Sequence, residues 1–165
     1  MNVEELLEQV TAGSIAKRAI TNHSVLNEAY DYGSAFSRGM RIDLNGLTIL
    51  LISGTASIDE RGNTVHVGDV RAQTRRTFHN ISELLAAENA TWHDVVRTTC
   101  YLRDIERDYK AFNEERTAFY REEKLVPLPA STGIQATLCR PDLLVEIEAI
   151  AMFRHEDVQP EQCEE

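Results

Sequence analysis

Two carboxylates, Glu146 and Glu148, stand in a strongly apolar stretch, PASTGIQATLCRPDLLVEIEAIA (residues 129–151). Their neighbours Val145 and Ile147 are typical of a strand, and side chains alternate along a strand, so both acids are expected on one face. Acids spaced in this way either line a water-facing surface or lie in a cleft with shifted pKa values, where they could perform acid–base chemistry. Periodicity alone favours the surface, because an unpaired charge is rarely buried.

Other residues could take part in a functional site, but each of them also has a purely structural interpretation. Ser53-Gly54-Thr55 ends an apolar strand, where the glycine marks either a simple bend or, equally, a bulge or a close approach of the backbone to a ligand. Asn113 lies in a predicted helix and is either a solvent-facing residue or a cap for a loop. Cys139 is either a small buried hydrophobic residue or a site residue.

Several known site motifs are missing from the sequence. None of the five histidines forms HExxH or another ligand spacing, so we expect no metal. The glycines do not form a phosphate-binding loop, and GxSxG does not occur. We therefore expect no cofactor.

Composition indicates one domain, and the 165 residues suffice for a hydrophobic core. The net charge of −10 disfavours a nucleic-acid-binding protein, because phosphates would be repelled. No apolar stretch is long enough to span a bilayer, and the acidic, amphipathic N-terminus does not resemble a signal peptide. The three cysteines are far apart and without CxxC, which favours free thiols in a cytoplasmic protein.

Hydrophobic periodicity predicts six strands and two helices. Asn45-Gly46 between two strands is a strong hairpin signal, and Asp69 is expected to cap the first helix. The predicted elements are strands at Phe36–Leu44, Leu47–Ser57 and Thr64–Val67, a helix from Val70, a strand at Asp94–Leu102, a helix at Ile105–Glu123, and strands at Thr132–Leu138 and Leu143–Phe153.

This order predicts an α+β domain over residues 34–154, with two helices on one face of a single mixed sheet. Residues 1–33 are expected to form an extension with a short amphipathic helix before Gly13, and residues 155–165 an acidic tail. The uncovered sheet face predicts self-association.

The motifs in their order resemble the RidA/YjgF family, formerly called translation-inhibitor or endoribonuclease-like. They are Ser53-Gly54, VGDVRAQTRRTFHNI (67–81), DVVRTTCYLRD (94–104), Asn113 with Phe119, and PAST…LLVEIEAIA. The resemblance covers roughly residues 34–154. It implies a chorismate-mutase-like fold, a homotrimer and small-molecule clefts between subunits.

The resemblance also implies hydrolysis of reactive 2-imino or enamine acids to 2-keto acids and ammonia. The family's glutamate, which positions or protonates the water, corresponds to Glu146. Gly54 and Asn113 match family site positions, and Phe36 takes the place of a usual tyrosine. The family's carboxylate-binding arginine is replaced by Ser131, which cannot make a bidentate, charged contact.

Loss of this arginine leaves the substrate open. Another cation could replace it, with Arg140 and Arg38 as the candidates, or the substrate differs. A second resemblance, of SRGMRI, SGTASID, VHVGD and CRPDLLVEIE, points to the catalytic half of chorismatases, which hydrolyse an enol ether. It implies roles for Cys139 and Glu146, although chorismatases are about twice this length.

Both chemistries require a Glu146 with a raised pKa, which burial and the nearby Glu148 would produce. Backbone N–H groups near Gly54 and Thr55, and in a turn at Ser131-Thr132-Gly133, are expected to hold a carboxylate or oxyanion. A non-enzymatic alternative is a trimeric binding module that lost its chemistry with the arginine. Ribonuclease activity, suggested by the older family name, is disfavoured by the acidic charge.

Overall fold

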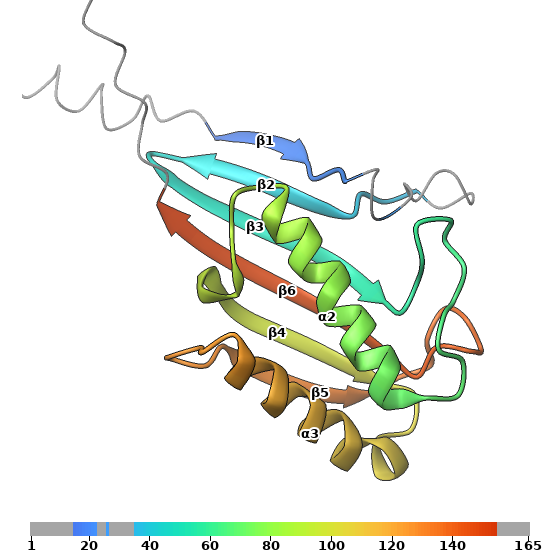
Figure 1. Ribbon diagram of the computed structural model, residues 1–165. Helices are drawn as coiled ribbons and strands as arrows, with labels where there is room; N and C mark the ends of the chain where they lie inside the picture. Colours follow the sequence, from blue (N-terminus) through green and yellow to red (C-terminus); the bar gives the residue numbers. More distant parts are fainter. Residues whose placement is uncertain (1–14, 23–25, 27–34, 155–165) are drawn as a thin grey trace, which may run out of the picture.

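The structure, a computed structural model, describes residues 15–22, 26 and 35–154 of the chain. One layer is a six-stranded sheet in the order β1–β2–β3–β6–β4–β5, and α2 and α3 lie together on one of its faces (Figure 1). The predicted α+β class with a mixed sheet is confirmed. The elements are β1 (Ala16–Ala19), β2 (Gly39–Leu44), β3 (Leu47–Ala56), α2 (Val70–Ala86), η2 (Trp92–Asp94), β4 (Val95–Leu102), α3 (Ile105–Glu122), β5 (Ala130–Gln135) and β6 (Val145–Arg154).

The pairing of the strands is antiparallel except between β4 and β5, which are parallel. The hairpin between β2 and β3 turns at Asn45 and Gly46, whose φ angles of 49° and 74° are both positive. Positive φ at both central residues is what a tight two-residue hairpin requires, so the Asn-Gly prediction is confirmed. The long strands β3 and β6 lie side by side in the middle of the sheet (Figure 1).

The predicted strand at Thr64–Val67 is wrong. Only an isolated bridge between Ile58 and Thr64 forms there. His66 adopts a φ of 58°, in the left-handed region, which interrupts an extended chain just before α2.

The sixth strand is instead β1, which lies within the segment 1–33 and pairs with β2. Two contacts attach it to the domain. Ile20 directly after it is fully buried in the core, and Arg18 donates two hydrogen bonds to the buried carboxylate of Glu88. Arg41 of β2 contacts the same carboxylate at 3.2 Å. The short helix predicted before Gly13 and the predicted tail at 155–165 lie outside the described residues.

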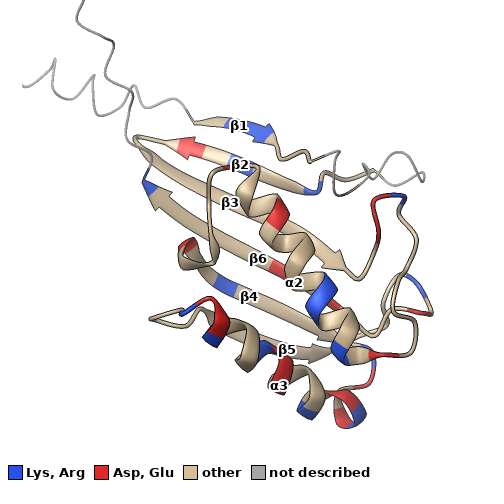
Figure 2. Cartoon of the chain, in the orientation of Figure 1, with Lys and Arg blue, Asp and Glu red and all other residues tan. Residues whose placement is uncertain are grey.

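The two helices form as their periodicity predicts. Asp69 caps α2 by accepting a hydrogen bond from the Ala72 N–H at 3.0 Å, which confirms the predicted cap. Ion pairs join the exposed sides of the helices, and both helices carry basic and acidic positions, coloured blue and red on the ribbon (Figure 2). Phe78 of α2 and Phe119 and Tyr120 of α3 form an aromatic cluster with Trp92 of η2.

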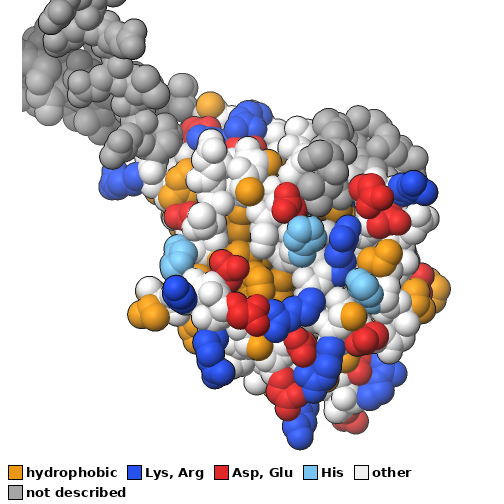
Figure 3. Space-filling model, in the orientation of Figure 1, with side chains coloured by type: hydrophobic (Ala, Val, Ile, Leu, Met, Phe, Trp, Pro, Cys, Tyr) orange, Lys and Arg blue, Asp and Glu red, His pale blue; other side chains and the backbone are white. Residues whose placement is uncertain are grey.

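The two faces of the molecule differ in character. On the helical face, acidic and basic side chains are intermixed over α3 (Figure 3). The opposite sheet face exposes the apolar side chains of Leu51, Ile134 and Met152. None of the helices in the described part of the chain is long and apolar enough to cross a membrane.

Candidate active site

Glu146 and Glu148 lie on the sheet face opposite the helices. The alternate residues Val145 and Ile147 are fully buried in the core beneath the helices, which confirms the predicted alternation. At the Glu146 end, this face is not open to solvent, because the segment between β5 and β6 folds over it. Leu138 and Leu143 of that segment pack on Ala56 of β3, the direct cross-strand neighbour of Glu146.

A cavity of about 250 Å³ opens beside this cluster, here called the Glu146 cavity. It brings together residues that are more than 100 positions apart in the sequence. Six of the predicted site residues line it: Phe36, Arg38, Gly54, Cys139, Arg140 and Glu146. Ala56, Ile58 and Leu143 complete an apolar wall that sequence reasoning did not assign to a site.

Buried polar contacts fix the start of β6 and therefore the position of Glu146. The fully buried Gln73 of α2 accepts a hydrogen bond from the Leu144 N–H at 2.8 Å and donates one to the Asp142 carbonyl at 2.9 Å. Arg103 donates to the Leu143 carbonyl at 2.6 Å. Since these groups are held by both helix and sheet, the carboxylate projects from a rigid strand.

Gly54 allows the Glu146 carboxyl to lie directly against the backbone of β3. The β3–β6 register shifts between Ile52 and Thr55, so Gly54 is part of a bulge. A Cβ atom at Gly54 would lie 2.1 Å from Oε1 of Glu146, which is impossible without displacing the carboxyl group. Gly54 therefore lies in a bulge and in close contact with the Glu146 side chain, and the approach of its backbone to a ligand stays a prediction.

The environment of Glu146 favours its protonated form. Burial raises the pKa of the Glu146 carboxyl, and the negative charge of Glu148 raises it further. Glu148 itself lies in a neighbouring cavity of about 280 Å³ with Arg97 and Thr99, and accepts a hydrogen bond from the Tyr101 hydroxyl at 3.0 Å. The two carboxylates thus share a face but occupy different cavities.

The two arginines expected as substitute cations have structural contacts in the Glu146 cavity. Arg38 is 4% exposed and lies 5.6 Å from the centre of the Phe36 ring. Arg140 donates to the Gly62 carbonyl at 2.6 Å. Thr55 lies outside this cavity, because it faces the helices and donates to the Ser53 carbonyl. Among the described residues, no three His, Cys, Asp or Glu side chains converge as metal ligands would.

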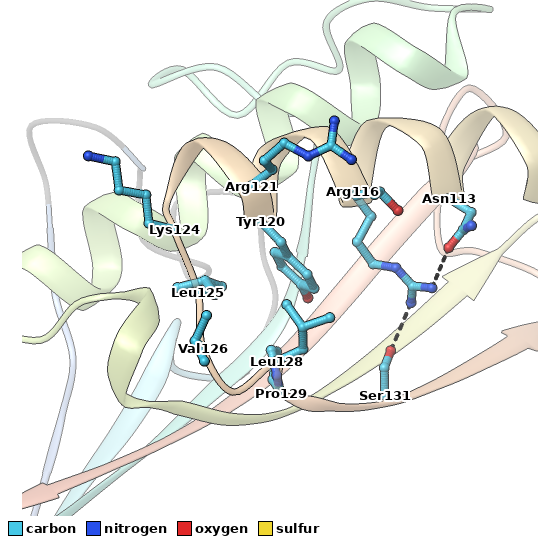
Figure 4. A pocket seen from close by; sticks show the side chains of 11 residues that line it. Asn113, Arg116, Tyr120, Arg121, Lys124, Leu125, Val126, Leu128, Pro129 and Ser131 are labelled. Carbon is cyan, nitrogen blue, oxygen red and sulfur yellow. Dashed lines mark hydrogen bonds between the residues drawn. The ribbon is translucent and has the colours of Figure 1, made fainter.

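Asn113 and Ser131 belong to a second pocket of about 620 Å³ between α3 and β5, here called the Arg116 pocket (Figure 4). The predicted turn at Ser131–Gly133 is wrong, because Ala130–Gln135 pairs with β4 as the edge strand β5. Sequence reasoning did not assign a site role to Arg116, which contacts both Asn113 and Ser131. The sequence did contain one indication of this role. Arg116 lies one turn after Asn113, on the side of the predicted helix that carries Phe112 and Tyr120.

The Glu146 cavity and the Arg116 pocket do not meet within one chain. Glu146 aligns with Tyr101 and Ile134 across the sheet, and Ser131 lies three residues before Ile134. Strand geometry therefore puts roughly 14 Å between the Cα atoms of Glu146 and Ser131. Ser131 also faces the helices, since its hydroxyl accepts from the buried Thr98, whereas Glu146 faces the opposite side.

Comparisons with known proteins agree with this fold. The profile of the family described as Endoribonuclease L-PSP matches residues 27–153. A protein named 3-aminoacrylate deaminase RutC, from Acinetobacter baylyi, is 36% identical over 103 residues, which cover 62% of this chain and 78% of that protein. A RutC family protein from Pyrococcus horikoshii is 34% identical over 102 residues, covering 62% and 77%. The solved structure of the E. coli YjgF gene product has a TM-score of 0.69 at 25% identity, and the match covers 83% of this chain and 99% of that one. The predicted resemblance is thereby confirmed.

Proposed function

We propose that this chain, which belongs to the endoribonuclease L-PSP family, hydrolyses small imines or enamines of amino acids to a carbonyl compound and ammonia. The observation that carries the proposal is the half-buried Glu146 carboxyl, held against Gly54 in a cavity that raises its pKa. The relative named 3-aminoacrylate deaminase supports the same reaction class. A carboxyl with a raised pKa holds its proton to higher pH than an ordinary glutamate, and it can act as the proton donor that an enamine needs.

The reaction follows from that proton donor. The Glu146 carboxyl protonates the enamine carbon, which gives an iminium ion and leaves a carboxylate on Glu146. This carboxylate then orients a water molecule toward the C=N carbon and takes a proton from it as the water adds. The resulting carbinolamine expels ammonia, so one water is consumed, one ammonia is released and Glu146 ends protonated.

The site is completed by a second copy of the chain in this proposal. The family resemblance implies a homotrimer with clefts between subunits. Two features of the described chain support it: the exposed apolar side chains of Leu51, Ile134 and Met152 on the uncovered sheet face, and the separation of the Glu146 cavity from Asn113 and Ser131. Association that seats this sheet face of one copy against the α3–β5 edge of another would bring the Glu146 carboxyl of the first toward the Arg116 pocket of the second.

A second candidate function is hydrolysis of an enol ether, as in chorismatases. The observation that favours it is that Cys139 shares the Glu146 cavity, as the chorismatase resemblance implies. Protonation of an enol ether carbon by Glu146 would follow the same first step. The imine reaction is preferred because a relative of this chain is named as a deaminase.

The proposed function is tested by trapping imines. An amino-acid oxidase generates imines from leucine, phenylalanine and alanine in the presence of semicarbazide, whose adduct is followed by absorbance. We expect this protein to slow adduct formation in proportion to its concentration, because it removes the imine first. Undiminished adduct formation with every imine, together with consumption of chorismate, would replace the proposal with the enol-ether reaction. If adduct formation is undiminished and chorismate is not consumed either, both reactions are excluded and a non-catalytic binding protein is the remaining function.

A further inference from the structure

Arg116 is held in place by uncharged partners. Its Nη1 donates to the Ser131 hydroxyl at 3.0 Å, and its Nη2 donates to the Asn113 side-chain oxygen at 2.6 Å. The guanidinium also lies 5.2 Å from the centre of the Phe112 ring. These contacts fix the plane of the guanidinium while leaving most of its N–H donors available for a further acceptor.

Arg116 is one of three arginines on α2 and α3, with Arg76 and Arg121, that contact no carboxylate among the described residues. Arg71, Arg75 and Arg107 each contact at least one carboxylate. In the described part of the chain, the hydrogen bonds of Arg116 go to neutral oxygens alone. A fixed guanidinium without a carboxylate partner, beside a pocket, is suited to bidentate binding of a carboxylate.

The pocket next to this cation is largely apolar. Beyond Arg116, its walls come from Tyr120, Leu125, Val126, Leu128 and Pro129. Figure 4 shows Arg116 extending from α3 toward Ser131, whereas the charged ends of Arg121 and Lys124 point away from it. A volume of about 620 Å³ exceeds what a three-carbon acid requires.

The Tyr120 hydroxyl is a second, independent sign of a ligand. Tyr120 is 6% exposed, and its hydroxyl lies near Thr98 but forms no hydrogen bond of normal geometry with the described residues. Burial raises the pKa of this phenol, so it stays protonated and can donate. A buried donor without an acceptor is costly, and a bound polar ligand would satisfy it.

We infer that Arg116 binds the substrate carboxylate, replacing the cation that the sequence lacks at Ser131, and that the Arg116 pocket selects acids with bulky apolar side chains. The serine leaves space beside β5, and Arg116 fills it from α3, where its guanidinium contacts the serine hydroxyl. The catalytic part of this inference rests on the proposed function, whereas the binding part does not. The substrate class is the 2-imino acids derived from branched aliphatic or aromatic amino acids.

Calorimetric titration of the full chain tests the binding part with stable 2-oxo acids. Three probes separate the contributions: 4-methyl-2-oxopentanoate, pyruvate with the same head and a smaller tail, and 4-methylpentan-2-one with the same tail and no carboxylate. We expect the first to bind tightest and pyruvate to bind roughly tenfold more weakly or worse. The ketone lacks the charged contact, so it should bind roughly tenfold more weakly than 4-methyl-2-oxopentanoate, or worse.

Three variants then assign the contact. Arg116→Gln keeps hydrogen-bonding ability without charge and should weaken 4-methyl-2-oxopentanoate about 10- to 100-fold. Arg116→Lys keeps the charge but loses the bidentate geometry. Its affinity for 4-methyl-2-oxopentanoate should therefore lie between those of the parent and of Arg116→Gln. Lys110→Gln is the matched control, because it removes an exposed positive charge from the same helix, and its affinity should equal that of the parent.

The outcomes separate this inference from the proposed function. Equal affinity of Arg116→Gln and the parent, or no binding of 4-methyl-2-oxopentanoate to the parent, would overturn the inference even if imines are hydrolysed. Arg116-dependent binding without hydrolysis of any imine would uphold the binding site and remove the proposed reaction. Where hydrolysis occurs, the leucine imine should be consumed faster than the alanine imine, and Arg116→Gln should raise KM more than it lowers kcat.

Discussion

Glu146→Gln is expected to fold and associate like the parent and to hydrolyse imines at least about 10²-fold more slowly, because the amide cannot supply the proton. Glutamine has nearly the same shape as protonated glutamate, so the contact with Gly54 and the wall of Ala56 and Leu143 should persist. The loss should appear in kcat rather than in KM, since binding of the carboxylate is assigned to another residue. The imine-trapping rate and the molecular mass in solution check these two expectations.

The difference in stability between Glu146→Gln and the parent should depend on pH. The pKa of Glu146 is raised in the folded protein, so its ionised form opposes folding. Below the pKa that Glu146 has in the unfolded chain, the carboxyl is protonated in both the folded and the unfolded protein, and it costs no stability. The loss of stability then develops as pH rises through the raised pKa of the folded protein. Glu146→Gln should therefore match the parent in melting temperature at low pH and exceed it increasingly as pH rises.

Glu148→Gln is the matched control for the position of the charge. It alters the same face of the same strand, and glutamine can still accept the Tyr101 hydrogen bond. Removing the negative charge at residue 148 should lower the pKa of Glu146, so the fall in activity at high pH should move to lower pH. Full activity in Glu146→Gln, or equal losses in the two variants, would remove Glu146 from the role of proton donor.

Gly54→Ala is expected to reduce turnover by about 10²-fold with little loss of stability, because it displaces a catalytic group without opening the core. The added Cβ would come within 2.1 Å of Oε1 of Glu146 and 3.0 Å of Cδ, so the carboxyl must rotate away. That end of the side chain is flexible and faces a cavity, which makes the rotation easy but the new position unproductive. The imine-trapping rate and the thermal midpoint measure the two effects.

A double variant decides whether the glycine acts through Glu146 alone. If it does, Gly54→Ala combined with Glu146→Gln should be no slower than Glu146→Gln by itself, because the displaced carboxyl is already gone. Additive losses would mean that Gly54 has a separate role, such as backbone binding of the substrate. Parental activity in Gly54→Ala would show that the observed position of the carboxyl does not matter for turnover.

Local patterns were sufficient to predict most of the elements. Alternation around Val145 placed Glu146 and Glu148 on one face, Asn45-Gly46 fixed the hairpin, and Asp69 began α2 where predicted. β1 was missed because its four residues, AKRA, are all exposed and have no alternation. Its attachment depends on the distant Glu88, which no local pattern reveals.

The site was predictable only in part, for a related reason. Six predicted residues meet in the Glu146 cavity, but it was the family resemblance that brought Phe36 and Cys139 together with Glu146. Arg116 was missed because its role depends on which strand α3 packs against. Helical periodicity identified its face, but the neutral partners Asn113 and Ser131 that leave its charge available are visible only in three dimensions.

The central claim, a site shared between copies with Glu146 from one and Arg116 from another, is tested most directly by mixing two variants that are each impaired at imine concentrations below the parental KM. Glu146→Gln and Arg116→Gln are produced together in one cell, each with a different affinity tag, and assemblies carrying both tags are purified. Every closed trimer that carries both tags has one of its three interfaces joining an intact Glu146 to an intact Arg116, so the purified mixed assemblies should restore about a third of the parental imine hydrolysis. Mixed assemblies no more active than either variant alone would contradict a shared site.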